Sequence, residues 1–171
     1  MPLTAPPEGR LLAVLKVHAP ALSRLAASYT RSTDEREDLL QDIALALHLA
    51  LPSFRGDASE RTFVLRVAHN RAITFAARRG AAVDIADHED ALVASSGKNP
   101  ELRFERAERG QRLLAAVRTL PLTHRQVMTM LLEGLAHREI AEVLGVTENV
   151  VAVRANRARA ALKVLLEGEG S

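Results

Sequence analysis

The clearest structural signal in the chain is AHREIAEVLGVTENVVAVRANRARAAL at residues 136–162. Ala141, Gly145 and Val151 in this segment have the spacing of two helices that cross closely. The small side chain of Ala141 allows the close contact, and Gly145 tolerates the positive φ that a tight turn needs. Val151 then returns an apolar side chain to the core, and Thr147 is a good cap for the second helix. The segment therefore predicts a helix-turn-helix.

In such a motif the second helix usually enters the major groove of duplex DNA. Its first turn offers Thr147, Glu148 and Asn149 to base edges, where Asn pairs with adenine and Glu accepts from cytosine. The full set of candidate duplex-binding residues is Arg138, Thr147, Glu148, Asn149, Arg154, Asn156 and Arg157. The alternative for this segment is an ordinary helical bundle whose arginines form a solvated face.

The composition favours packed helices. Of the 171 residues, 47% are hydrophobic but only 3% are aromatic, and there is no Trp, so Leu, Ala and Val must fill the core. The absence of Cys excludes disulfides, thiolate metal sites and a cysteine nucleophile. No run reaches the roughly 18 apolar residues of a membrane helix, and the N-terminus does not resemble a signal peptide. We expect a cytoplasmic protein without membrane insertion.

Charge and breaker residues divide the chain into two modules. Residues 1–79 hold 11 basic and 8 acidic side chains, a net +3; residues 80–110 hold 4 and 7, a net −3; residues 111–171 hold 8 and 6, a net +2. We expect an all-α chain of two small helical domains joined by a flexible linker. The expected parts are a flexible N-terminus at 1–9, a domain at 10–79, an acidic linker at 80–108, a helix-turn-helix domain at 109–166 and a loose tail at 167–171.

Local patterns predict the individual helices. Residues 10–30 suggest one or two short helices interrupted at Pro20, and Ser32 with Glu35 is a good start for the next helix. A turn-rich loop at 52–59 precedes a third helix, and a fourth begins at Pro100. The expected apolar faces are Leu40, Ile43, Ala44 and Leu47 in the second helix and Phe63, Val64, Val67 and Ala68 in the third. A capping box is expected at Thr123–Gln126.

Nothing in the sequence indicates catalysis. The six histidines are scattered without the spacing of metal ligands, and there is no glycine-rich phosphate loop. We therefore expect neither an enzyme nor a bound cofactor or metal.

Two separate motifs in the first half resemble region two of the extracytoplasmic-function sigma factors, a group of bacterial transcription-initiation proteins. Glu37–Asp42 reads Glu-Asp-Leu-Leu-Gln-Asp and resembles that family's Asp-Leu-Val-Gln-Glu helix. The resemblance implies that this helix binds the clamp helices of the beta-prime subunit of RNA polymerase core. The residues implied in that contact are Asp38, Leu39, Gln41 and Asp42.

The second motif comprises Ser53–Asp57 and Thr62–Asn70, which resemble the family's Phe-Arg-Gly-Glu loop and Thr-Trp-Leu-Tyr-Arg-Ile-Ala-Arg-Asn helix. The resemblance implies that the loop holds a flipped base of the −10 element and that the helix carries the melted strand. Basic grooves with aromatic walls suit single strands. The implied residues are Ser53, Phe54, Arg55, Gly56, Asp57, Arg61, Phe63, Arg66, His69, Asn70 and Arg71. Phe63, Leu65 and His69 replace the family's usual Trp, Tyr and Arg.

Leu120–Val127, Glu133–Ala141 and Arg154–Arg159 are similar to region four of the same family, which reads the −35 element and docks on the beta flap. Ala152 and Val153 replace a usual basic residue and Ser, so two polar contacts are missing. The resemblance implies an alternative sigma factor whose partners are RNA polymerase core, promoter DNA and an anti-sigma factor.

The main alternative is a helix-turn-helix transcriptional regulator that does not bind polymerase core. It accounts for residues 111–166. It leaves the acidic helix, the Phe-Arg-Gly-Asp loop and the basic helix of residues 1–79 unexplained.

Overall fold

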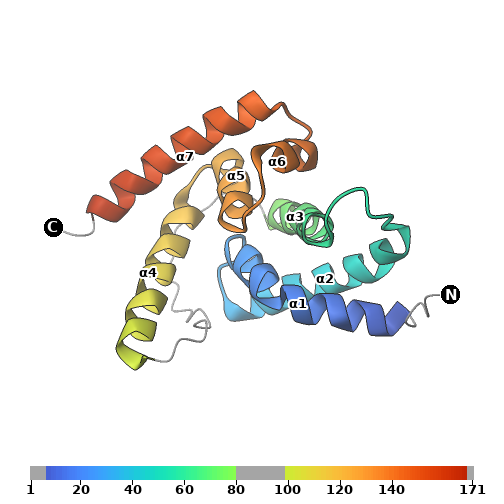
Figure 1. Ribbon diagram of the computed structural model, residues 1–171. Coiled ribbons are helices and arrows are strands. Elements are labelled where there is room, and N and C mark those ends of the chain that lie inside the picture. Colours follow the sequence, from blue (N-terminus) through green and yellow to red (C-terminus); the bar gives the residue numbers. More distant parts are fainter. Residues whose placement is uncertain (1–6, 80–98, 169–171) are drawn as a thin grey trace. The chain divides into compact units, whose positions relative to one another are not determined.

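The computed structural model describes residues 7–79 and 99–168. Within these ranges all regular structure is helical, which confirms the expected all-α class. The chain divides into two units, Met1–Ala81 and Ala82–Ser171, and each is described by itself. The elements are α1 (Pro7–Ala27), α2 (Thr33–Ala50), the 3₁₀ helix η1 (Leu51–Ser53), α3 (Glu60–Arg78), α4 (Pro100–Thr119), α5 (Leu122–Leu132), α6 (His137–Leu144) and α7 (Glu148–Gly168). The α-helices are labelled in Figure 1.

In the first unit α1, α2 and α3 pack against one another (Figure 1). The expected start of α2 is confirmed, since the Ser32 hydroxyl accepts from the Glu35 N–H at 3.2 Å. The Glu35 carboxylate in turn accepts from the Arg31 N–H at 2.7 Å, which satisfies a second backbone donor at this end. The first turn of α2 is therefore capped by two side-chain hydrogen bonds, and its acidic residues Asp34 and Glu35 lie at the positive end of the helix dipole.

The buried faces of α2 and α3 are rotated about the helix axis relative to the faces that the apolar pattern predicts. In α2 the buried residues are Leu39, Ile43 and Leu47, whereas Leu40 and Ala44 are half-buried. In α3 Phe63 and Val67 are half-buried, and the buried face is made of Thr62, Val64, Leu65, Ala68, His69, Ala72 and Phe75. One residue of register moves a side chain by about 100° around a helix, so an apolar pattern with several candidates does not fix the face.

Pro20 does not interrupt the first helix. α1 is continuous from Pro7 to Ala27 with Pro20 inside it, so the expectation of a break there is wrong. Pro20 is exposed, so water can satisfy the backbone carbonyl that its missing N–H leaves unpaired. Val14, Leu22 and Leu25 are buried, and their packing offsets the cost of the proline.

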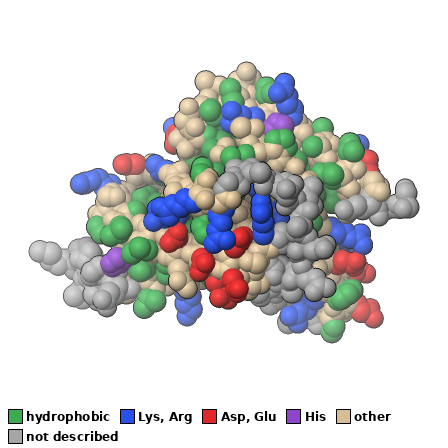
Figure 2. Space-filling model, turned by 180° about the vertical axis from the view of Figure 1, so that it is seen from behind, with side chains coloured by type: hydrophobic (Ala, Val, Ile, Leu, Met, Phe, Trp, Pro, Cys, Tyr) green, Lys and Arg blue, Asp and Glu red, His purple; other side chains and the backbone are tan. Residues whose placement is uncertain are grey.

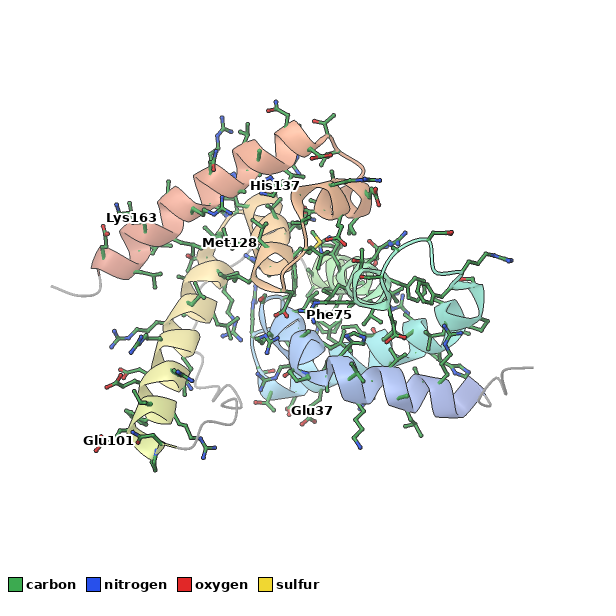
Figure 3. All side chains as sticks on the ribbon, viewed as in Figure 1. Glu37, Phe75, Glu101, Met128, His137 and Lys163 are labelled. Carbon is green, nitrogen blue, oxygen red and sulfur yellow. The ribbon has the colours of Figure 1, made fainter. Side chains whose placement is uncertain are left out.

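The second unit contains the predicted helix-turn-helix, formed by α6 and α7. Gly145 has φ 65° and ψ 35°, the left-handed conformation expected of it, and ends α6. Ala141 is 6% exposed and Val151 is fully buried, as expected of the small and the apolar residue of this motif, and α6 and α7 pack against each other. The same unit contains a hydrophobic core cluster of Ala116, Val117, Leu120, Met128, Ala158 and Leu162, with Met128 on α5 labelled in Figure 3.

The junction between α4 and α5 is held by a residue that the pattern did not single out. Arg125 is 5% exposed, and its guanidinium donates to the carbonyl oxygens of Arg118 at 2.6 Å and Leu120 at 3.1 Å. These carbonyls at the end of α4 would otherwise lack partners. The capping box expected at Thr123–Gln126 is wrong, because α5 starts at Leu122 after Pro121 without a side-chain cap.

The ends of the helices extend beyond the expected domain bounds. Asn99 caps α4 by accepting from the Glu101 N–H at 3.2 Å, and α4 begins at Pro100 as expected. Residues 100–108 therefore belong to this helix and not to the linker. Ion pairs four residues apart, Arg109–Glu105 at 3.0 Å and Arg112–Glu108 at 2.9 Å, lie along this exposed part. α1 and α7 likewise include parts of the expected flexible ends, and the remainder of the linker, 80–98, lies outside the described residues. On the face shown in Figure 2, hydrophobic side chains are interspersed with charged ones.

Replacing Arg125 tests its role at this junction. We expect Arg125→Ala to lower the free energy of unfolding by about 1–3 kcal/mol, because buried carbonyls lose their donors. The matched control is Arg112→Ala, which removes an exposed ion pair and is expected to cost less than about 0.5 kcal/mol. Urea unfolding of the full chain measures both, and equal losses would contradict the buried role.

Candidate functional site

One side of α2 carries the residues expected to meet a protein partner. Asp38 and Gln41 are exposed and Asp42 is half-buried. Leu45 and Leu49 continue the same row and are 53% and 71% exposed. We call Asp38, Gln41, Leu45 and Leu49 the outer face of α2. The motif alone did not include the two leucines, although Leu45 and Leu49 follow Gln41 by about one and about two helical turns, and this spacing was the available signal.

Leu39 does not belong to this surface. Its side chain is 0% exposed and lies in the core with Ile43 and Leu47, so the expectation that it touches a partner is corrected. Leu39 follows Asp38 by one residue, which turns it about 100° inward. It supports the outer face of α2 from behind.

Arg79, directly after α3, places a cation beside the acidic start of α2. Its guanidinium lies 2.6 Å from the Glu35 carboxylate and 4.0 Å from that of Asp38, and its Cζ is 4.9 Å from the centre of the Phe75 ring. The Asp38 side chain still has 65% of its surface exposed. Asp38 is therefore held close to Arg79 and remains accessible.

The loop between η1 and α3 has both ends anchored. The Ser53 hydroxyl donates to the Ala50 carbonyl at 2.7 Å, and the Phe54 N–H donates to that of Leu51 at 3.1 Å. At the other end the Ser59 hydroxyl caps α3 by accepting from the Thr62 N–H at 3.0 Å. Between them Gly56 has φ +82°, which a residue with a side chain adopts only at a cost. The tip of the loop, Arg55, Gly56 and Asp57, is exposed.

An aromatic pair with a cation beside it lies at the base of this loop. The ring centres of Phe54 and Phe63 are 4.6 Å apart at 36°, and Cζ of Arg10 lies 5.7 Å from the Phe54 centre. Phe54 and Phe63 are half-buried, so part of this wall faces solvent. Arg10 was not expected here, because no local pattern connects the start of α1 to a loop so far along the chain.

The candidate residues of α3 divide into exposed and buried positions. Arg61 and Asn70 are exposed, and Arg66 and Arg71 are half-buried. His69 is 2% exposed, and its ring lies edge-on to Tyr29 with 6.2 Å between the ring centres. Burial lowers the pKa of His69 from 6.5 to about 4. The expectation that His69 contacts DNA is therefore corrected: it is a neutral core residue.

In the second unit the first turn of α7 is capped and carries exposed polar side chains. The Thr147 hydroxyl accepts from the Val150 N–H at 3.3 Å, so Thr147 caps the helix. Glu148 and Asn149 follow it and are exposed. Of the other candidates, Asn156 and Arg157 are exposed, and Arg154 is half-buried. Arg138 on α6 is exposed and lies 3.4 Å from Glu142.

Asn149, Val153 and Asn156 lie on one side of α7, which we call the outer face of α7. They are all exposed, and they lie opposite Val151, Ala155, Ala158 and Leu162, which are buried against the rest of the unit. Val153 is 41% exposed although it is apolar. It is the one member of this face that the candidate set omitted.

Metal sites and membrane-spanning helices are both absent from the described residues. Within 7–79 and 99–168 there is no group of three His, Cys, Asp or Glu side chains that could hold a metal ion. Over the same residues, every helix is too short or too polar to cross a membrane.

Comparison with known proteins defines the class. Residues 14–82 match the family described as Sigma-70 region 2, and residues 110–162 match Sigma-70, region 4. The fold is similar to CnrH in complex with the cytosolic domain of CnrY, with a TM-score of 0.64 and 23% identity over 94% of this chain and 90% of that one. It is also similar to the sigma factor RpoE in complex with the anti-sigma factor NepR from Bartonella quintana, with a TM-score of 0.68 and 23% identity over 94% and 96%. The two units thus have the fold of a sigma factor.

Sequence relatives identify the group. The ECF RNA polymerase sigma factor SigM of Mycobacterium tuberculosis is 31% identical over 150 residues, 87% of this chain and 73% of that protein. The ECF RNA polymerase sigma-E factor of Escherichia coli K12 is 29% identical over 150 residues, 82% and 78%. The chain belongs to the extracytoplasmic-function sigma factors. It is not an enzyme, and it directs promoter-specific transcription initiation by RNA polymerase. The alternative of a regulator without a polymerase role is thereby excluded.

The low pKa of His69 makes the stability of the first unit dependent on pH. In the unfolded chain His69 binds a proton below pH 6.5, but in the folded chain only below about pH 4. Its contribution is therefore complete above pH 6.5 and is lost as the pH falls towards about 4. We expect unfolding by urea to require about 2 kcal/mol less free energy near pH 5 than near pH 7.

The matched control for this prediction is His69→Phe, which keeps a ring in the core but cannot be protonated. All other titratable groups are the same in the two proteins. The difference between the pH dependences of their unfolding free energies therefore isolates His69. An identical pH dependence in both proteins would contradict the assignment.

Proposed function

We propose that the outer face of α7 reads the −35 element as duplex, while the loop at 53–59 and α3 hold the −10 element as a single strand. The observation that carries this proposal is that each unit has its own exposed polar surface on a rigid helical frame. Two such surfaces are what simultaneous recognition of two promoter elements requires.

The duplex-reading role is supported by the chemistry at the start of α7. Glu148 and Asn149 are exposed beyond the Thr147 cap, where a reading helix meets base edges. Arg157 is exposed two turns further along, within reach of a phosphate backbone when the helix lies in the groove. Arg138 on α6 adds a further cation to the motif, although it already lies near Glu142.

The single-strand role is supported by the aromatic pair and its cations. Single strands bind surfaces that combine stacking platforms with positive charge. Phe54 and Phe63 supply the platform, and Arg10, Arg55 and Arg61 supply charge around it. Because both ends of the loop are anchored, little ordering entropy has to be lost when a base is held there. Phe63, in the position of the family's Trp, acts as part of a wall.

We further propose that the outer face of α2 binds the clamp helices of the beta-prime subunit and that the second unit docks on the beta flap. The outer face of α2 combines a carboxylate with two exposed leucines, Leu45 and Leu49. Apolar side chains surrounded by polar ones are typical of the centre of a protein interface. Asp38 then supplies charge complementarity at the rim.

An anti-sigma factor is a further proposed partner. CnrH was solved with the cytosolic domain of CnrY, and RpoE with the anti-sigma factor NepR. A partner of this kind that covered the outer face of α2 would exclude polymerase from it.

Transcription reconstituted from purified chain and RNA polymerase core on a library of promoters tests the proposed function as a whole. We expect initiation at promoters with a shared −35 sequence and a shared −10 sequence. Initiation that depends on only one of the two elements would contradict two-point reading.

Reversing one charge on the outer face of α2 tests polymerase binding. We expect Asp38→Arg to raise the dissociation constant for core by roughly tenfold or more, since it replaces an attractive charge by a repulsive one. Binding to −35 duplex should not change. The control is Glu37→Arg, because Glu37, labelled in Figure 3, is exposed but lies off that face. Equal losses in the two variants, or a parallel loss of duplex binding, would contradict the proposed contact.

A pair of substitutions in α7 separates base reading from phosphate binding. We expect Asn149→Ala to alter the base preference at one position of the −35 element at a cost of about 1–3 kcal/mol. Arg157→Ala should weaken all duplexes alike and reduce the slope of log K against log salt by about 0.9. Binding titrations over several salt concentrations measure the base preference and the salt dependence. An unchanged base preference in Asn149→Ala would contradict a base-contacting role for Asn149.

A further inference from the structure

Val153 is an apolar residue in the middle of a polar surface. It is 41% exposed on the outer face of α7, between Asn149 and Asn156. It is not among the buried residues of α7, because Val151, Ala155 and Ala158 form the buried side of this part of the helix. Single exposed apolar residues are common on proteins. Val153 differs from these because it lies on the face of α7 that is proposed to read DNA.

The spacing places Val153 among base edges if the outer face of α7 enters the major groove. Val153 follows Asn149 by four residues and precedes Asn156 by three, so the side chains are about 6 Å and about 4.5 Å apart along the helix axis. Base pairs rise by about 3.4 Å. Val153 would therefore lie within about two base pairs of the one that Asn149 contacts.

The chemistry of the groove limits what Val153 can recognise. Every base edge in the major groove offers hydrogen-bond donors or acceptors, and the one apolar group there is the C5 methyl of thymine. A valine side chain neither donates nor accepts, so against other edges it would displace water from polar atoms without replacing their bonds. Against a thymine methyl both surfaces leave water favourably.

We infer that Val153 contacts a thymine methyl group and makes the −35 preference of this sigma factor require a thymine within about two base pairs of the position read by Asn149. The inference rests on the proposed reading of duplex by α7. It gives a positive role to a position where the family's usual polar residue is absent.

Removing the single methyl group tests this inference. Holoenzyme assembled from the full chain and core first selects −35 duplexes from a random-sequence library. Each thymine of the selected element is then replaced by deoxyuridine, which lacks only the methyl. We expect one such replacement to weaken binding about two- to fivefold, the effect of burying one methyl group. In Val153→Ala the same replacement should have no further effect.

The matched control is Val164→Ala, because Val164 is the same residue type on the same helix and is 72% exposed, three turns beyond Val153. It should keep the full response to deoxyuridine. Val153→Thr keeps the branched shape and one of the two methyl groups, so it should keep part of the response.

Three results would overturn the inference while the proposed function stands. They are a selected element without thymine near the position that responds to Asn149→Ala, an equal response to deoxyuridine in the wild type and Val153→Ala, and loss of the response in Val164→Ala. Failure of the holoenzyme to select any −35 sequence would instead overturn the proposed function, and the inference with it.

Discussion

A unit of three or four short helices can bury only one side of each helix, and most features of this sigma factor depend on that constraint. In α2 the buried side is Leu39, Ile43 and Leu47, which leaves Asp38 and Leu45 facing outward. In α7 the buried side is led by Val151, which leaves Asn149 and Val153 outward. The surfaces proposed to bind polymerase and DNA are therefore the reverse sides of the same helices that form the two cores.

The constraint also draws polar residues into the cores, where each must be satisfied or neutral. The buried guanidinium of Arg125 donates hydrogen bonds to carbonyls at the end of α4. His69 lies edge-on to Tyr29, and burial lowers its pKa to about 4, so it is neutral near pH 7. Arginine and histidine are both common in nucleic-acid sites. Burial shows that Arg125 and His69 belong to the cores and not to the exposed candidate surfaces.

The loop before α3 shows how a small domain presents an irregular segment with little freedom. Its two ends are tied by the hydroxyls of Ser53 and Ser59, and its turn is made by Gly56. The aromatic pair beneath it receives its cation from α1, at the opposite end of the unit's sequence. A surface suited to a single strand thus combines two local caps with one contact between distant segments.

Much of the fold follows from short-range patterns: the all-α class, the Ser32 cap of α2, the left-handed Gly145 and the burial of Ala141 and Val151 all depend on residues close together in the chain. So do Asp38, Gln41 and Asn149 as exposed candidates. Which side of a helix is buried depends on the helices packed against it. The sequence alone therefore predicts Leu39 and His69 as exposed contact residues, although both are buried. It also predicts a break at Pro20, although packing keeps α1 continuous there. Three arginines have partners that are distant in the sequence or lie on another helix: Arg10, Arg79 and Arg125. The periodicity of one segment does not determine the position of another segment, so only the packed structure shows these contacts.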